Sequence, residues 1–422
     1  MKKILLSILL SGVILASLAA CGSQAGSGAQ ESGADRESTE EKADVSAMSF
    51  DEMKEAAKGT EVTFYGWGGD EELNQWLDDV FAPQMKEKYD ITMNRVPMDI
   101  DQVLSQLAGE AQAGEEDGSI DMIWINGENF QSAKENGFLY GPFTEALPNF
   151  NDYVDAESED VTMDFAYPIE GYEAPYGKAQ LVLFHDSAVT PEAPKSAEEL
   201  LEYCKIYKGK VTYPALPDFT GSAFVRNLIY EICGYEQFMD MEADKETVRA
   251  AIEPALAYMR SLNPYLWNEG KTFPDSSTTL DKMFADGEVV FNMSYAPYGV
   301  ATGIANGTYT ATTESFQFEK GTVGNTNFMA VSSNSGNKPG ALVAINEMIS
   351  PEMQASRYEA LRTLPVVEYE KLDDAQKEAF DSVDIGEGVI PQDELLSKRL
   401  PEMPAELVPI IEEIWQEEVV GK

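Results

Sequence analysis

Along residues 61–135, the spacing of apolar residues alternates between that of a strand and that of a helix. The stretch "EVTFYGW" is an apolar run typical of a strand, and in Asp70–Tyr89 the residues Leu73, Trp76, Leu77 and Phe81 recur at helical spacing. A second strand, "ITMNRVP", precedes a helix over Asp99–Ala113, and a third strand, "SIDMIWIN", precedes the helix "ENFQSAKENGF". Strands that alternate strictly with helices predict a parallel sheet with crossover helices.

The first and third of these strands both end in tryptophan and glycine. Ligands of open parallel sheets bind beyond the carboxyl ends of the strands. The two ends therefore predict one binding crevice, lined by Trp67, Gly68, Gly69, Trp124, Asn126, Gly127, Glu128 and Asn129. A tight strand-to-helix turn is the simpler interpretation of the glycine pair.

The second half of the chain predicts another α/β unit. Ser196 caps the helix "AEELLEYC", "KVTYPAL" is a predicted strand, and Thr220-Gly221-Ser222 opens the helix that ends near Cys233. Two extended stretches flank this unit, and we expect hinge strands at Gly177–Leu183 and Asn327–Val331. The prediction is lobe 1 at 59–178 plus 325–422, which includes the C-terminal helices, and lobe 2 at 179–324.

The N-terminus has the pattern of a lipoprotein signal. Lys2 and Lys3 precede an apolar run that ends in Leu18-Ala19-Ala20-Cys21, which looks like a lipobox. We expect a signal peptide at 1–20 and a lipidated Cys21 that begins an acidic, disordered tether at 21–58. A cleaved soluble secretion signal and an uncleaved anchor are the alternatives. The predicted location is the outer face of the cell membrane.

Charge and composition exclude several classes of function. The 422 residues carry a formal charge of −44, which disfavours binding to nucleic acid and to anionic lipid headgroups. With one histidine, His185, a histidine-based triad or a multi-histidine metal site is nearly excluded. We therefore expect no catalytic residues, no metal site and no cofactor. Cys204 and Cys233 could form a disulfide or remain buried thiols.

Several of these motifs together resemble a known family. "YGWGGDEELNQWLDDVFAP", "IDMIWINGENFQSAKENGFLYGPF", "APYGKAQLVLFHD", "NPYLWNEGKTFP" and "SYAPYGVATGI" are similar to family 1 extracellular solute-binding proteins of ABC importers, in the YnjB-type branch. The resemblance covers roughly residues 62–420. It implies a two-lobe type II periplasmic-binding-protein fold with two parallel-rich sheets and a two-strand hinge. It also implies a monomer that delivers a small molecule to a membrane permease and its ATPase.

Residue types narrow the ligand only in part. Helix starts attract anions, and Thr220, Gly221 and Ser222 open a helix without an acid in its first turn. Aromatic residues at strand ends and in loops suit a flat cation, and Glu128 adds negative charge. A thiamine-like heterocycle, with or without phosphate, fits both features; a polyamine, a sugar or a metal ion are alternatives, and an extracytoplasmic enzyme is the alternative of another class. The remaining expected ligand-binding residues are Tyr176, Phe219, Tyr295, Tyr298 and Asn327.

Overall fold

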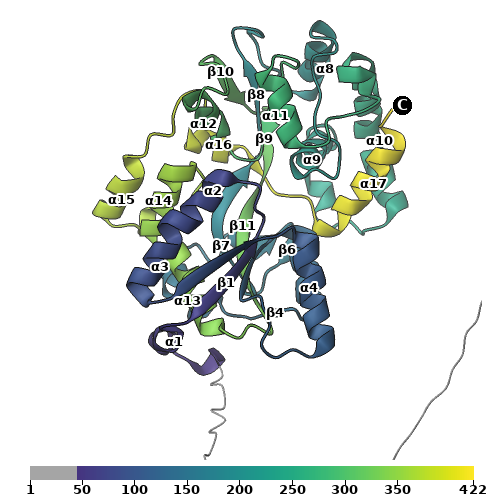
Figure 1. Ribbon diagram of the computed structural model, residues 1–422. Coiled ribbons are helices and arrows are strands. Elements are labelled where there is room, and N and C mark those ends of the chain that lie inside the picture. Colours follow the sequence, from purple (N-terminus) through teal and green to yellow (C-terminus); the bar gives the residue numbers. More distant parts are fainter. Residues whose placement is uncertain (1–44) are drawn as a thin grey trace, which may run out of the picture. The chain divides into compact units, whose positions relative to one another are not determined.

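The computed structural model describes residues 45–422, which form a mixed α/β structure with two main sheets (Figure 1). The strands are β1 Glu61–Gly66, β2 Thr92–Pro97, β3 Met122–Ile125, β4 Leu139–Tyr140, β5 Met163–Asp164, β6 Tyr167–Pro168, β7 Glu173–Gln180, β8 Val182–Asp186, β9 Asn292–Ser294, β10 Thr313–Phe316, β11 Thr322–Ser332 and β12 Arg399–Leu400. The α-helices are α1 Phe50–Ala57, α2 Glu71–Trp76, α3 Ala82–Tyr89, α4 Ile100–Ala113, α5 Gly127–Glu135, α6 Pro148–Tyr153, α7 Glu159–Thr162, α8 Ala197–Ile206, α9 Phe219–Cys233, α10 Lys245–Leu262, α11 Ser277–Ala285, α12 Gly299–Ala305, α13 Lys338–Met348, α14 Pro351–Leu361, α15 Asp374–Asp381, α16 Gln392–Ser397 and α17 Val408–Glu418.

The first sheet confirms the strand–helix alternation. Its order is β12-β11-β3-β1-β2, and β1 runs parallel to both β2 and β3. The predicted helix over Asp70–Tyr89 is present as α2 and α3, joined by a π-helical turn at Leu77–Phe81. Because β1 and β3 are parallel neighbours, their carboxyl ends lie side by side, where the sequence placed the crevice.

The second sheet differs from the parallel-rich arrangement that the resemblance implied. It has the order β10-β8-β9, and both strand pairs are antiparallel. The predicted strand "KVTYPAL" is also absent: residues 211–215 belong to no strand. Pro214 has no N–H to donate to a ladder, and Val211 and Ala215 instead make single backbone hydrogen bonds to Trp267 and Pro274.

Two strands connect the sheets, as expected for a hinge. β7 belongs to the first sheet, and the chain enters β8 of the second sheet directly after Leu181. The return strand β11 pairs antiparallel with β7 along most of its length. The crossing in β11 lies earlier than predicted, because Val323 packs into the second core whereas Phe328 already packs into the first. A third connection, which the sequence did not indicate, follows β12: Leu400 packs against the second core and Met403 lies in it.

Three large groups of buried side chains organise the structure. Two of them cover the opposite faces of the first sheet, one with α1–α3 and α13 and the other with α4 and α5 (Figure 1). The third surrounds the second sheet with α8–α11, and it includes Ile411, Ile414 and Trp415 of α17. The C-terminal helix α17 therefore packs on the second lobe, not on the first as its position in sequence suggested.

The first residues that the structure describes already belong to the folded body. The expected tether reached residue 58, but α1 is folded: Ser49 and Glu52 form a capping box, and Met53 and Ala57 are buried in the first lobe.

Cys204 and Cys233 are free thiols. Within residues 45–422, no helix has the length and apolar character needed to span a membrane.

Candidate functional site

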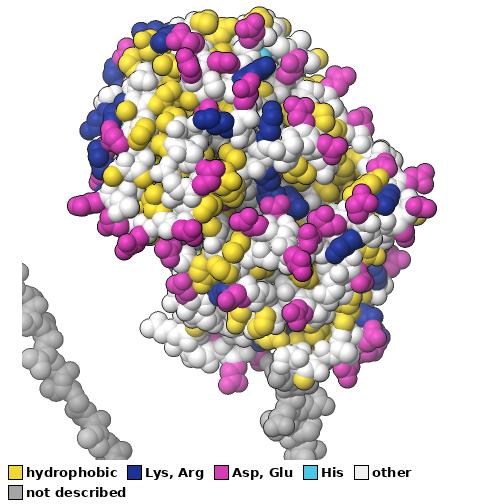
Figure 2. Space-filling model, turned by 180° about the vertical axis from the view of Figure 1, so that it is seen from behind, with side chains coloured by type: hydrophobic (Ala, Val, Ile, Leu, Met, Phe, Trp, Pro, Cys, Tyr) yellow, Lys and Arg dark blue, Asp and Glu magenta, His cyan; other side chains and the backbone are white. Residues whose placement is uncertain are grey.

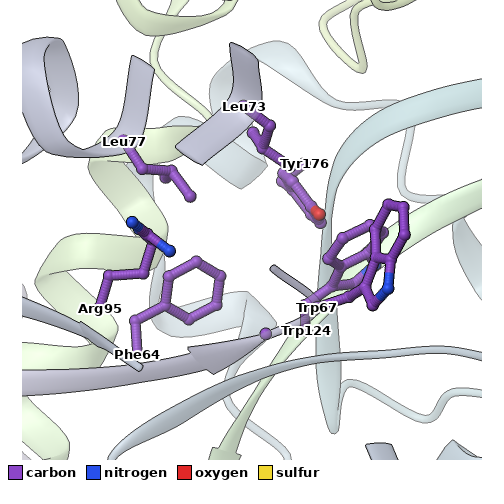
Figure 3. A pocket seen from close by; sticks show the side chains of 8 residues that line it. Phe64, Trp67, Leu73, Leu77, Arg95, Trp124 and Tyr176 are labelled. Carbon is purple, nitrogen blue, oxygen red and sulfur yellow. The ribbon is translucent and has the colours of Figure 1, made fainter. Parts of the chain in front are cut away.

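The turn after β1 places Trp67 on the surface beside the end of β3. Its side chain is 54% exposed, and its ring meets that of Trp124 edge-on, with the centroids 6.4 Å apart. Trp124 in turn meets Tyr176 of β7 at 5.9 Å. These rings and Arg95 line a cavity of only about 10 Å³ (Figure 3), room for about one water, which is too small for an organic ligand.

The glycine pair allows this turn to close. A Cβ on Gly69 would lie 2.1 Å from the Trp67 ring, and one on Gly68 would lie 2.4 Å from Pro97 Cβ. The Gly68 carbonyl accepts a hydrogen bond from Asn74 Nδ2 at 2.8 Å. Because neither glycine has a side chain, both leave room for neighbouring atoms of the protein. This agrees with the simpler interpretation, a tight strand-to-helix turn, and this turn sets the position of Trp67.

The start of α5 is held from two sides. Asn126 accepts a hydrogen bond from Trp124 Nε1 at 2.9 Å and donates to the Thr326 carbonyl at 2.6 Å. The Gly127 N–H donates to the buried Asp164 carboxyl group, and the Phe165 ring lies against Gly127. These contacts tie the end of β3 to β11 and to the loop after β5.

The start of α9 forms the opposite group. Phe219 is 46% exposed, and its ring meets Tyr295 at 5.0 Å and Phe165 at 6.5 Å. Phe165 packs with Ala405 and Val408, and its ring connects Gly127 with Phe219 and so with Tyr295. The structure thus brings together the predicted residues at the ends of β3 and at the start of α9.

The predicted anion anchor at Thr220–Ser222 is occupied by side chains of the protein. Asp218 caps α9 by accepting from the Gly221 N–H at 2.9 Å, and Ser222 Oγ donates to Glu412 at 2.6 Å. Ser222 also accepts from Arg226 Nη1 at 2.6 Å. In this arrangement the first turn of α9 already has carboxylate partners.

Arg226 forms a buried ion pair at this site. Its guanidinium donates to Glu402 through Nε at 3.0 Å and through Nη2 at 3.2 Å, and the Tyr295 hydroxyl donates to the same carboxylate. The guanidinium also lies 5.6 Å from the Phe165 ring centroid and 6.0 Å from that of Phe219. Neither charged residue was among the predicted site residues; the one usable signal was the arginine within the mainly apolar stretch 223–230 of α9.

The carboxyl group of Glu128 has a shifted pKa. Although Glu128 is exposed, the protein around its carboxylate raises its pKa by desolvation. Glu412 and Glu402 raise this pKa further, and Arg226 opposes them. Asn129 Nδ2 makes a long hydrogen bond of 3.4 Å to Glu128.

One of the predicted residues, Tyr298, lies elsewhere. Tyr298 is buried in a separate cluster with Tyr358, their ring centroids 6.3 Å apart. Asn327 lies at the bulge between β11 and β7, opposite Gly177.

His185 is buried and its Nδ1 contacts Thr190 Oγ1 at 2.8 Å. No group of three or more potential metal ligands occurs among the described residues.

Comparison with known families explains this architecture. A family model described as "Bacterial extracellular solute-binding protein" matches residues 81–380. The chain belongs to this family. Solute-binding proteins of this kind serve ABC transporters, and the family places the chain outside the cytoplasm.

A curated relative supports the family, and two solved structures support the fold. This solute-binding protein is 35% identical to protein YnjB of Escherichia coli (strain K12) over 373 residues, which are 87% of the chain and 93% of YnjB. An ABC transporter protein of Clostridium perfringens ATCC 13124 has the same fold, with a TM-score of 0.60 at 20% identity over 85% of this chain and 98% of that one. The spermidine/putrescine substrate-binding protein PotD of Streptococcus pneumoniae has a TM-score of 0.60 at 12% identity, over 85% and 99% of the two chains. The type II fold and the family are therefore established.

Proposed function

We propose that this solute-binding protein captures a cationic aromatic small molecule, such as a thiamine-like heterocycle, in the cleft between its lobes. The observation that carries the proposal is the pair of exposed rings, Trp67 and Phe219, beside an excess of carboxylates. A cation over an aromatic face gains about 0.5–2 kcal/mol per contact. The protein binds without turnover and hands the ligand to an ABC permease.

The charge balance at the start of α9 supports a positively charged ligand. Glu128, Glu402 and Glu412 all act on the site, whereas Arg226 is the cation that acts on Glu128. Because Arg226 is paired with Glu402, it leaves Glu128 and Glu412 in excess. A bound cation would offset this excess and favour the ionised form of Glu128.

A polyamine is the second candidate. It would use the same carboxylates, and the structural relative from Streptococcus pneumoniae is named as a spermidine/putrescine-binding protein. A polyamine, however, has no ring to stack on Trp67 or Phe219. The choice between the two ligands therefore depends on whether the exposed rings are needed for binding.

We also propose that the protein is a lipid-anchored monomer. Cys21, the expected lipidation site, lies outside the described residues. Acidic side chains are spread over the visible face of the molecule, with fewer Lys and Arg residues among them (Figure 2). Repulsion between such surfaces favours a single copy over self-association and keeps the body soluble beside the membrane.

The deciding experiment identifies what the protein carries. Native mass spectrometry of protein purified without refolding should detect a bound small cation. Titration with thiamine, thiamine phosphate and spermidine, followed by tryptophan fluorescence, then ranks the candidates. We expect saturable quenching by thiamine, with an affinity that increases with pH as Glu128 ionises and that loses this pH dependence in Glu128→Gln. Tight binding of spermidine without any response to thiamine would replace the proposal with its alternative.

A further inference from the structure

Arg357 of α14 is a buried charge without an acid directly beside it. It is 3% exposed, and its Nε has no hydrogen-bond partner among residues 45–422. Burial lowers the pKa of its guanidinium, whereas Tyr176 and Asp70 act in the opposite direction. Within the described part of the chain Arg357 forms no ion pair, so Asp70 acts on it only over a longer distance. Arginines are almost never fully buried unless they are paired, because a buried charge without a counter-charge costs stability.

The backbone of β7 leaves room for this guanidinium. Gly177 has no side chain, and a Cβ there would lie 2.4 Å from Arg357 Nη1. The same Nη1 donates to the Tyr176 carbonyl, which also accepts from Gln354 Nε2 at 2.9 Å. Because this carbonyl has a second donor, its hydrogen bonding does not depend on Arg357. The guanidinium also lies 4.3 Å from the centroid of the Tyr176 ring, which is well within the range of a cation–π contact.

The Tyr176 ring begins a series of aromatic contacts that ends at the surface. It meets the Trp124 ring with the centroids 5.9 Å apart and the planes at 85°, and Trp124 meets Trp67 at 6.4 Å and 68° (Figure 3). Both contacts have the edge-to-face arrangement that aromatic pairs prefer. Arg357, Tyr176 and Trp124 therefore form a continuous series of contacts from the core of the first lobe to the exposed ring of Trp67.

We infer that Arg357 is a positioning residue, which holds Trp67 in the orientation that meets the ligand. It acts in two ways. Its guanidinium stacks on Tyr176 and so supports Trp124, and its charge attracts Asp70, which caps the helix directly after the turn of Trp67. The inference rests on the proposed function as far as the ligand is concerned, whereas the ring contacts are present without a ligand.

The test measures the circular dichroism of the Trp67–Trp124 pair, because two indole rings in contact couple their absorption. Trp67→Ala identifies this signal as the part of the spectrum that it removes. We expect Arg357→Met to reduce the same part of the spectrum and to weaken the binding of thiamine by about two- to thirtyfold, the value of one cation–π contact. Arg357→Lys keeps the charge but not the planar group that stacks, and we expect the same two effects from it. If Arg357→Met fails to fold, Arg357→Lys decides.

Met53→Ala is the control for a loss of packing alone. Met53 is 1% exposed in α1 and belongs to the same core as Tyr176, so its truncation should lower stability and leave both the dichroism of the tryptophan pair and the affinity unchanged. Folded Arg357 variants with the wild-type dichroism would overturn the inference. Full affinity for thiamine in Trp67→Ala, together with a loss of dichroism in Arg357→Met, would instead overturn the proposed function and leave Arg357 as the residue that positions Trp67.

Discussion

At the scale of single residues, Trp67 and Trp76 lie in opposite environments. Trp67 is 54% exposed, whereas Trp76 is 3% exposed, stacks on Phe81 with the ring centroids 6.0 Å apart and donates to Ser356 Oγ at 3.1 Å. We expect Trp67→Ala to abolish binding of thiamine while the free energy of unfolding stays nearly constant. The matched change Trp76→Ala should cost about 3–5 kcal/mol, because it leaves a cavity in the core.

Urea unfolding and fluorescence titration of both variants check this prediction, with quenching of the remaining tryptophans as the binding signal. Full affinity for thiamine in Trp67→Ala would remove Trp67 from the site. A loss of stability as large as that of Trp76→Ala would mean that Trp67 serves packing.

The sequence could distinguish these two tryptophans but could not find the buried ion pair. Trp76 belongs to a helical stripe with Leu73 and Leu77, whereas Trp67 follows a strand end and precedes two glycines. Arg226 and Glu402 are 176 residues apart, and no local pattern connects them. Their pairing depends on the third connection between the lobes, which is a tertiary feature.

At the scale of elements, β7 has no room for a side chain at Gly177. A Cβ there would lie 2.4 Å from Arg357 Nη1. Arg357 is buried, its guanidinium lies 4.3 Å from the Tyr176 ring centroid, and it donates to the Tyr176 carbonyl. Gly177→Ala must displace this side chain, and we expect it to lower the free energy of unfolding by about 1–3 kcal/mol.

Gly109 provides the control for this substitution. It lies exposed in α4, and a Cβ would meet no atom within 4 Å. Gly109→Ala should therefore stabilise the protein by about 0.5–1 kcal/mol, the usual gain within a helix. Urea denaturation measures both changes. Equal stability of wild type and Gly177→Ala would mean that Arg357 moves freely beside β7.

Sequence patterns predicted the first elements of the first lobe correctly but did not predict the strand directions of the second sheet or the folded helix α1. The alternation of strand-like and helix-like spacing of apolar residues predicted the elements from β1 to α5, because each of them has its own apolar face. The strands of the second sheet are short, and nothing in "VLFHD" or "NMS" indicates the direction of the neighbouring strand. The end of the tether was missed because α1 is short, and its burial depends on contacts with α13, which is almost 300 residues away.

At the scale of the whole molecule, the proposed lipid anchor would decide where the protein works. We expect Cys21→Ser to move the protein from the membrane fraction to the soluble fraction, or to leave it as an uncleaved precursor, because the acceptor thiol is lost. Cys233→Ser is the control, since it changes a half-buried free thiol in the folded body. The Cys233→Ser protein should remain in the membrane fraction. Fractionation and the intact mass of each variant give the answer. Continued membrane attachment of Cys21→Ser would refute lipidation at this cysteine.

Buried acids give the stability of the whole fold a particular dependence on pH. Glu173 is fully buried, and neither of its carboxylate oxygens has a partner in the described part of the chain. Burial raises its pKa well above the usual value; Asp164 adds to this effect and Lys134 opposes it. Glu170 shows the opposite shift, because its exposed carboxylate bonds to Lys134, which lowers its pKa.

The sign of the effect of Glu173 follows from linkage. In the unfolded chain this carboxyl group ionises at a pKa of about 4.3, whereas in the folded protein it keeps its proton to higher pH. Its contribution to stability is therefore complete below pH about 4.3 and is lost as pH rises through the folded-state pKa. Glu173→Gln should raise the melting temperature at pH 7–8 and change it little at pH 4. Glu170→Gln, the control, should lower the melting temperature slightly at neutral pH and not at acid pH. Melting curves of both variants and the wild type from pH 4 to 8 measure these differences, and a lower melting temperature of Glu173→Gln at pH 8 would show that the ionised Glu173 is stabilised in the fold.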